Sequence, residues 1–255
     1  MKRVFFTFIV LFSALVAFAQ VKVVAHRGYW DVEGSAQNSI RALELAAEIG
    51  CYGSEFDVHI TSDGVLVVNH DGTINGIEIE DNPYSAIKDV KLKNGESLPT
   101  LEQYLECGSK LPNIQLIFEV KGHKLPENED RCVDASVEMV KSMGLEQRVE
   151  WISFSMRVCE RVHQLLPEAK VAYLSGNESP LSIKERGLTG IDYHLDVYKN
   201  HDEWLDEARQ NEVEVDVWTV DGEEDLTRFA NDARIDLITT NKPVLLQKIL
   251  SEKNH

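Results

Sequence analysis

The chain has 255 residues, and 43 acidic against 26 basic side chains give it a formal net charge of −17. So acidic a surface argues against nucleic acid or an anionic membrane as a partner. The four cysteines form no CxxC pair, which excludes a zinc-finger or thioredoxin-type motif, and because each adjoins an apolar segment we expect most of them to be buried thiols.

The first residues are typical of a secretory signal peptide. Lys2 and Arg3 precede an apolar run, and Ala17-Phe18-Ala19 is a small-x-small cleavage pattern. The run is shorter than the ~20 residues of a membrane span, so no stable span is predicted. We expect removal of residues 1–19 and export of residues 20–255 to a periplasmic location. Losing two basic and no acidic residues takes the net charge from −17 to −19.

From residue 20 onward, the sequence alternates between strand-like and helix-like segments. The expected parallel strands end near His26, Asp57, Lys121, Phe154, Leu174, Tyr193, Val220 and Thr240. The expected helices span 37–49, 99–108, 129–143, 157–166, 181–186, 202–211, 223–231 and 243–251. Eight such units predict a single α/β domain, a TIM (β/α)8 barrel, with a small polar insertion at about 61–97 after the second strand.

The stretch from residue 53 to residue 71 carries the first candidate site residues. Ser54–Ile60 reads as a strand, and the period of two places Glu55 and Asp57 on the same face. Thr61-Ser62-Asp63-Gly64 is typical of a tight turn. The apolar run that follows would return antiparallel and bring His70 back toward the two acids.

A third carboxylate follows the same rule on another strand. Glu119 and Lys121 are two residues apart and share a face. Because the carboxyl ends of barrel strands meet at one rim, we expect Glu119 to lie near Glu55 and Asp57 and to form an oxygen-rich site for one divalent cation, Mg²⁺ or Ca²⁺. The alternative is a buried Glu119–Lys121 ion pair beside a solvated Glu-Asp pair, which leaves the nearby histidines unexplained.

His26 and His70 are the candidate general acid and base, since imidazole titrates near neutral pH. Arg27 and Lys121 would supply fixed positive charge for a phosphate whose negative charge grows in the transition state. These residues leave open which histidine is the acid. No role is assigned to His59.

The ordered set of motifs resembles the glycerophosphodiester phosphodiesterases, relatives of the bacterial phosphatidylinositol-specific phospholipases C. The motifs are His26-Arg27-Gly28, Gln37-Asn38-Ser39, Glu55-x-Asp57, Thr61-x-Asp63-Gly64, His70-Asp71, Pro99-Thr100-Leu101, Glu119-x-Lys121, Ser153-Phe154, Trp218-Thr219-Val220 and Thr239-Thr240-Asn241-x-Pro243. The resemblance implies a TIM barrel that hydrolyses glycerophosphodiesters, small-molecule substrates, to sn-glycerol 3-phosphate and an alcohol. It implies that Glu55, Asp57 and Glu119 bind the metal. It implies that His26 and His70 are the acid/base pair. It also implies that Arg27, Lys121 and Trp218 bind the substrate.

The chain also departs from the family pattern. Gln37 stands where the family usually has a glutamate, and the segment 72–97 is shorter and more acidic than the usual insertion. Tyr29 and Trp30 follow the first strand and would either form an apolar lip or pack on the rim. The alternatives to a simple glycerophosphodiesterase are a catalytically silent binding protein, a phospholipase-like enzyme on lysolipids or polymeric phosphodiesters, and a glycosidase using two of the three acids.

Overall fold

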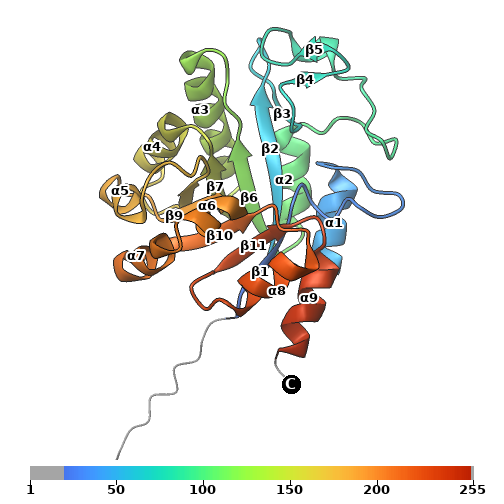
Figure 1. Ribbon diagram of the computed structural model, residues 1–255. Helices are drawn as coiled ribbons and strands as arrows, with labels where there is room; N and C mark the ends of the chain where they lie inside the picture. The colour runs from blue at the N-terminus through green and yellow to red at the C-terminus, as the bar shows by residue number, and fades with distance from the viewer. Residues whose placement is uncertain (1–19, 254–255) are drawn as a thin grey trace, which may run out of the picture.

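A closed barrel of eight parallel strands forms the centre of the protein in a computed structural model that describes residues 20–253 (Figure 1). The barrel strands are β1 (Lys22–Ala25), β2 (Gly53–Ile60), β6 (Gln115–Val120), β7 (Val149–Ser153), β8 (Val171–Tyr173), β9 (Gly190–His194), β10 (Glu214–Trp218) and β11 (Leu237–Thr240). Each pairs with the next around the ring, and β11 pairs with β1, so that the sheet has no open edge among these strands. The predicted TIM barrel is confirmed.

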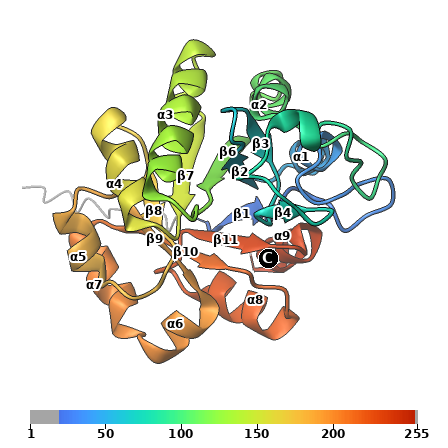
Figure 2. The ribbon, with the colours of Figure 1, turned by 90° about the horizontal axis from the view of Figure 1, so that it is seen from above.

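Helices surround the strands when the barrel is viewed from above (Figure 2). They are α1 (Ile40–Glu48), α2 (Leu101–Ser109), α3 (Pro126–Ser142), α4 (Met156–Leu165), α5 (Pro180–Glu185), α6 (Leu195–Asn200), α7 (Glu203–Asn211), α8 (Glu223–Asn231) and α9 (Pro243–Glu252). Helix α6 was not predicted. The helix expected from residue 37 begins at Ile40, because the Ser39 side chain caps it by accepting from the backbone N–H of Ala42 at 3.0 Å. This late start leaves Gln37 and Asn38 in a loop, free to face the barrel mouth.

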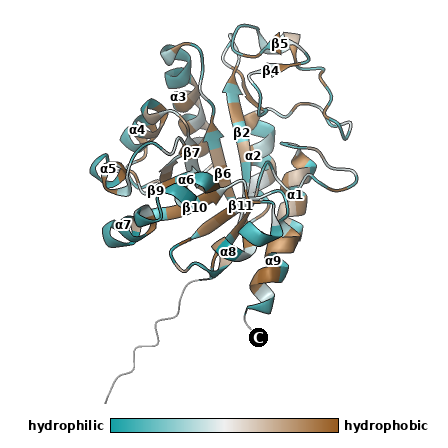
Figure 3. Ribbon diagram, in the orientation of Figure 1, coloured by the Kyte–Doolittle hydropathy of each residue, from teal (hydrophilic) through white to brown (hydrophobic). Residues whose placement is uncertain are grey.

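Apolar packing between strands and helices holds the barrel together. The aromatic rings of Phe56, Phe118 and Trp151, on three neighbouring strands, pack with centroids 4.8 and 4.6 Å apart. All three side chains are buried, and Figure 3 shows hydrophobic residues concentrated on the strands, with hydrophilic ones on much of the outer helices. Because the strands are fixed from outside in this way, their carboxyl ends form a rigid rim.

The predicted insertion stands beside the carboxyl end of β2 (Figure 1). It contains β3 (Leu66–Val68), which pairs antiparallel with β2, the small hairpin of β4 (Thr73–Ile74) and β5 (Ile77–Glu78), and the short 3₁₀ helix η1 (Tyr84–Ala86). Its own apolar cluster consists of Val67, Ile79, Ile87 and Leu98, all buried. The insertion is therefore a small packed lobe, and β3 leads the chain back to the barrel mouth at His70.

All four cysteines are free, and three of them, Cys51, Cys132 and Cys159, are buried, as predicted. Burial raises the pKa of the Cys51 thiol to about 12, so it is an inert packing residue at neutral pH. Among residues 20–253, no helix has the length and apolar character needed to cross a membrane. The predicted signal peptide lies outside the described residues.

Candidate active site

A cavity of about 220 Å³ opens at the carboxyl ends of the barrel strands. Seven of the eight predicted site residues line it: His26, Arg27, Glu55, His70, Glu119, Lys121 and Trp218. The eighth, Asp57, is 1% exposed and lies next to Glu55 and Glu119, with one carboxylate oxygen of each acid within 4.8 Å of the others. The structure therefore brings the whole predicted set together.

The three acids converge because of strand register. Asp57 on β2 is the direct partner of Glu119 on β6, and Glu55 precedes Asp57 by one full strand period. All three are buried. Lys121 Nζ lies 2.7 Å from Glu119 Oε1 and 3.2 Å from Asp57 Oδ1. The ion pair considered from the sequence is present, but it forms part of the acidic cluster and does not replace it.

Burial and neighbouring charges shift the pKa values of the three acids in different directions. Burial, and then repulsion by Asp57, raise the pKa of Glu119 to about 8, and burial raises the pKa of Glu55 in the same direction. Burial also acts on Asp57, but Lys121, His70, Asn38 and Arg27 outweigh it and lower its pKa. The cluster cannot carry three negative charges at neutral pH without more positive charge beside it.

The carboxylate oxygens of the three acids fit a divalent cation. Glu55 Oε1 is buried and accepts no hydrogen bond, although Glu55 Oε2 accepts one. Asp57 Oδ1 and Glu119 Oε1 have the Lys121 ammonium as their partner. An unpartnered buried carboxylate oxygen such as Glu55 Oε1 is costly by itself. Three carboxylates that each place one oxygen within 4.8 Å of the others match the ligands that Mg²⁺ and Ca²⁺ prefer.

The turn after β1 positions Arg27. Its φ of 56° is in the left-handed region, and this turn directs the Arg27 backbone N–H at Glu55 Oε2, 2.7 Å away. The guanidinium reaches Gln37 Oε1 at 2.9 Å, and its Nε lies 3.8 Å from Asp57 Oδ2. Gly28 follows at φ 76°, and an added Cβ would come within 2.6 Å of Ala42. Sequence and packing therefore both fix this turn.

His26 has a defined tautomer. Its Nδ1 lies 2.9 Å from Asn241 Oδ1, and the Asn241 amide is oriented because its Nδ2 donates to Asp221 Oδ2 at 2.7 Å. An amide oxygen can only accept, so His26 Nδ1 carries the proton and the neutral ring keeps a lone pair on Nε2. Burial, and then Arg27, lower the pKa of His26 to about 4. The ring is neutral at neutral pH.

His70 has a carboxylate partner, whereas the partner of His26 is an amide. Its Nδ1 is 2.7 Å from Asp71 Oδ1, and its side chain is 38% exposed. The Asp71 carboxylate accepts a hydrogen bond from the Nδ1–H group of His70. His59, to which no role was assigned, donates from Nε2 to the backbone oxygen of His70 at 3.2 Å. It supports the segment that carries His70.

Trp218 forms part of the apolar wall of the cavity. Its indole N–H donates to the Asp192 backbone oxygen at 2.9 Å, and its ring packs edge-on against Phe154 with centroids 5.4 Å apart. These contacts fix the ring at the end of β10. Trp218 therefore offers a rigid apolar surface beside the polar groups.

Three supporting residues gain their importance only from the structure. Asn38 holds Asp57 through two hydrogen bonds, donating to Oδ2 at 2.8 Å and accepting from the backbone N–H at 3.2 Å. Asn241 and Asp221 hold His26. Asn38 and Asn241 stand in recognised motifs, but their partners are far along the chain, and nothing in the sequence signals Asp221.

An eight-stranded β/α barrel with acids, two imidazoles and two cationic side chains at its carboxyl end defines the class of the protein: a barrel hydrolase built for a phosphoester. The glycerophosphoryl diester phosphodiesterase family model matches residues 26–245, and the chain belongs to that family. The resemblance seen in the sequence is confirmed.

Individual relatives agree with this assignment. A glycerophosphodiester phosphodiesterase from Parabacteroides distasonis of known structure is 49% identical, with a TM-score of 0.91, over 92% of this chain and 99% of that one. A protein named glycerophosphodiester phosphodiesterase from Caldanaerobacter subterraneus is 29% identical over 88% of this chain and 95% of its own length. A phosphodiesterase from Oleispira antarctica, solved with the product sn-glycerol-3-phosphate, shares the fold at 22% identity, with a TM-score of 0.75 over 91% of this chain and 97% of that one.

Proposed function

We propose that the protein hydrolyses glycerophosphodiesters to sn-glycerol 3-phosphate and an alcohol, with the help of one divalent cation. The observation that carries this proposal is the convergence of the three acids, Arg27, Lys121 and both imidazoles on one cavity. Family membership and the product bound to the Oleispira antarctica relative support the choice of substrate. A glycosidase would leave both histidines and Arg27 without a role.

Glu55, Asp57 and Glu119 would hold the cation, Mg²⁺ or Ca²⁺. When bound, such an ion neutralises the carboxylates, polarises a phosphoryl oxygen and lowers the pKa of a nearby hydroxyl. Arg27 and Lys121 line the cavity and bind the remaining phosphoryl oxygens. Trp218 packs against the carbon skeleton of the substrate. The phosphodiester is thus held between the acids on one side and the imidazoles on the other.

The different environments of the two histidines support one assignment of their roles. His26 is neutral and has its Nε2 lone pair available, so it removes the proton from the attacking hydroxyl, either of water or of the glycerol C2 carbon. His70, paired with Asp71, donates a proton from Nε2 to the leaving alkoxide. Two titratable groups that differ so clearly in their surroundings are well suited to acid and base work in one reaction.

The test is release of sn-glycerol 3-phosphate from glycerophosphoethanolamine, measured with a coupled dehydrogenase, for the wild-type protein and for His26→Ala and His70→Ala. We expect turnover by the wild-type protein and a loss of about 10²-fold or more in each variant. Hydrolysis of aryl glycosides but not of the phosphodiester would overturn the proposal. A wild-type protein that binds the substrate without cleaving it, at any added metal concentration, would instead identify a silent binding protein.

A further inference from the structure

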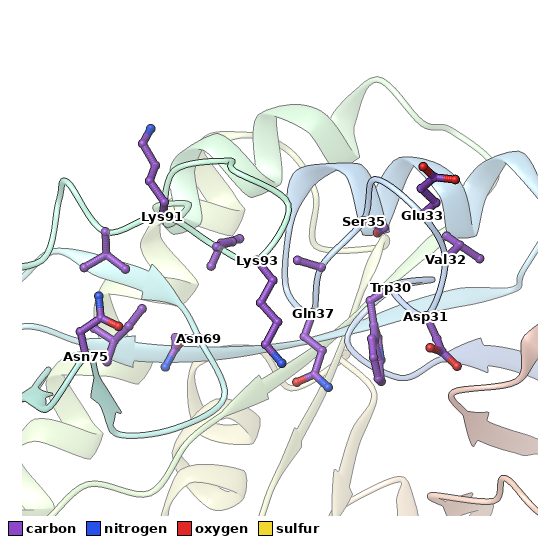
Figure 4. A pocket seen from close by; sticks show the side chains of 14 residues that line it. Trp30, Asp31, Val32, Glu33, Ser35, Gln37, Asn69, Asn75, Lys91 and Lys93 are labelled. Carbon is purple, nitrogen blue, oxygen red and sulfur yellow. The ribbon is translucent and has the colours of Figure 1, made fainter.

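The structure has a second, larger cavity of about 590 Å³, and Figure 4 shows the side chains that line it. One wall is the loop after β1, including Trp30 and Gln37, and the other is the insertion, including Asn69 and Lys93. A side pocket of this size holds more than ethanolamine or glycerol. It is the natural place to search for recognition of the leaving alcohol.

Two hydrogen bonds and one step along the chain connect the walls of the two cavities. Gln37 in the larger cavity accepts from Arg27 in the smaller one at 2.9 Å. Trp30 donates its indole N–H to Asn241 Oδ1 at 2.9 Å, the same oxygen that accepts from His26. Asn69 directly precedes His70, the proposed acid. The chain therefore passes from the wall of the larger cavity to the proposed acid in one residue step.

Two acids and two lysines line this cavity: Asp31, Glu33, Lys91 and Lys93. Lys91 donates to Ser97 Oγ at 2.8 Å. Asp31 is neutralised by an ion pair with Lys242, and the Glu33 carboxylate points away from the side on which Lys93 and Gln37 extend (Figure 4). The Lys93 side chain runs from the insertion into the cavity (Figure 4). It forms no ion pair or hydrogen bond with any residue in the range 20–253, and the Gln37 amide N–H₂ group likewise has no acceptor there.

We propose that this cavity binds a leaving alcohol that carries a second phosphate group. Lys93 would pair with that phosphate, the Gln37 amide would donate to it, and the flat face of Trp30 would cover the carbon skeleton. A free ammonium and an unused amide donor that line one cavity are complementary to an anion, and the ammonium opposes the choline or ethanolamine groups of common glycerophosphodiesters. This inference rests on the proposed phosphodiesterase activity and specifies the substrate class.

The experiment compares two substrates that differ only in the second phosphate. These are glycerophosphoglycerol and the same compound phosphorylated on its leaving glycerol. We expect the wild-type kcat/KM to be about 10-fold or more higher for the phosphorylated substrate, because a charge-assisted contact adds to its binding. Lys93→Gln should lower this ratio by about 10-fold, and Lys93→Glu should bring it below one.

Lys88→Gln is the matched control. Lys88 is in the same insertion, pairs with the neighbouring Asp89 and does not line the cavity, so both rates should be unchanged. Cleavage of both substrates at equal kcat/KM, or a ratio that Lys93→Gln leaves intact, would overturn the second-phosphate site while the proposed function stands. Cleavage of neither substrate would overturn the proposed function and the site with it.

Discussion

The barrel contains two sets of buried acids, and their difference shows what makes a site. The rim acids, Glu55, Asp57 and Glu119, stand on β2 and β6. The core acids, Asp192 and Asp216, are direct partners on β9 and β10, and each is at most 7% exposed. Asp192 also lines the active-site cavity, on the side away from β2, whereas Asp216 does not line it. Both sets contain carboxylate oxygens that accept no hydrogen bond.

The surroundings of the two sets separate them. Burial, together with neighbouring acids, raises the pKa of both Asp192 and Asp216 well above the usual range, and within residues 20–253 neither forms an ion pair. Both shifts favour the uncharged form of these acids. The rim acids have Lys121 and Arg27 beside them and place three oxygens around one point. Burial alone favours the protonated carboxylic acid, whereas convergence beside flanking cations gives an acidic cluster that could hold a metal ion.

The sharpest way to test this comparison is to replace one acid in each set with its isosteric amide. Glu119→Gln should lower kcat by about 10³-fold, because the ligand that completes the cation site is lost. Asp216→Asn should change kcat by less than about two-fold, since a protonated acid and an amide are both neutral. The measurement is steady-state hydrolysis at saturating metal. Equal losses in both variants would contradict the distinction.

A second test separates the two histidines by leaving group. His70→Ala should lose about 10²-fold on an alkyl alcohol but far less on a p-nitrophenyl ester, which leaves without protonation. His26→Ala should lose about the same factor on both, because the base acts on the attacking hydroxyl. The ratio of kcat/KM for the two substrates measures this effect. The reverse pattern would exchange the assigned roles.

The pH profile tests the neutral state of His26. Its pKa is lowered to about 4, so the base form persists above that pH and is lost only as pH falls through about 4. At pH 5 this leaves about 30-fold more base than an imidazole with its ordinary pKa would provide. The measurement is the acid limb of the kcat/KM profile at saturating metal. A fall in kcat/KM near pH 6.5 that is caused by protonation of His26 would show that burial does not lower the pKa of this ring.

The smallest expected loss of activity comes from replacing Asn241, the residue that holds His26. Asn241→Ala should lower kcat by about 10-fold with little change in KM, because the ring loses the partner that fixes its tautomer. Asp221→Asn should have a weaker effect in the same direction, since it acts only through Asn241. An increase in KM without a change in kcat would instead place Asn241 in substrate binding.

The sequence predicts the parts of the molecule that depend on local periodicity. The pairs Glu55/Asp57 and Glu119/Lys121 each share a face by the strand period, and the alternation of segments predicts the barrel. His70 follows from a hairpin only a few residues long. These expectations agree with the structure because neighbouring positions on a strand or hairpin determine them.

The remainder depends on contacts between distant segments. His26 and Asn241 are separated by 215 positions and meet only because β11 closes the barrel against β1. Asp192 and Asp216 read as single acids in two apolar strands until the sheet places them side by side. The cavity at Lys93 likewise exists only where the insertion faces the loop after β1. No local pattern encodes these pairings.

The most direct test of the central claim is calcium or magnesium titration of chelator-treated protein while sn-glycerol 3-phosphate release is followed. The rim acids predict no release after chelation, restoration by the added ion, and no restoration at the same ion concentration in Glu55→Ala. Release at the full rate in the chelated protein, or an unaltered ion response in Glu55→Ala, would contradict the assignment of the three acids as the cation site.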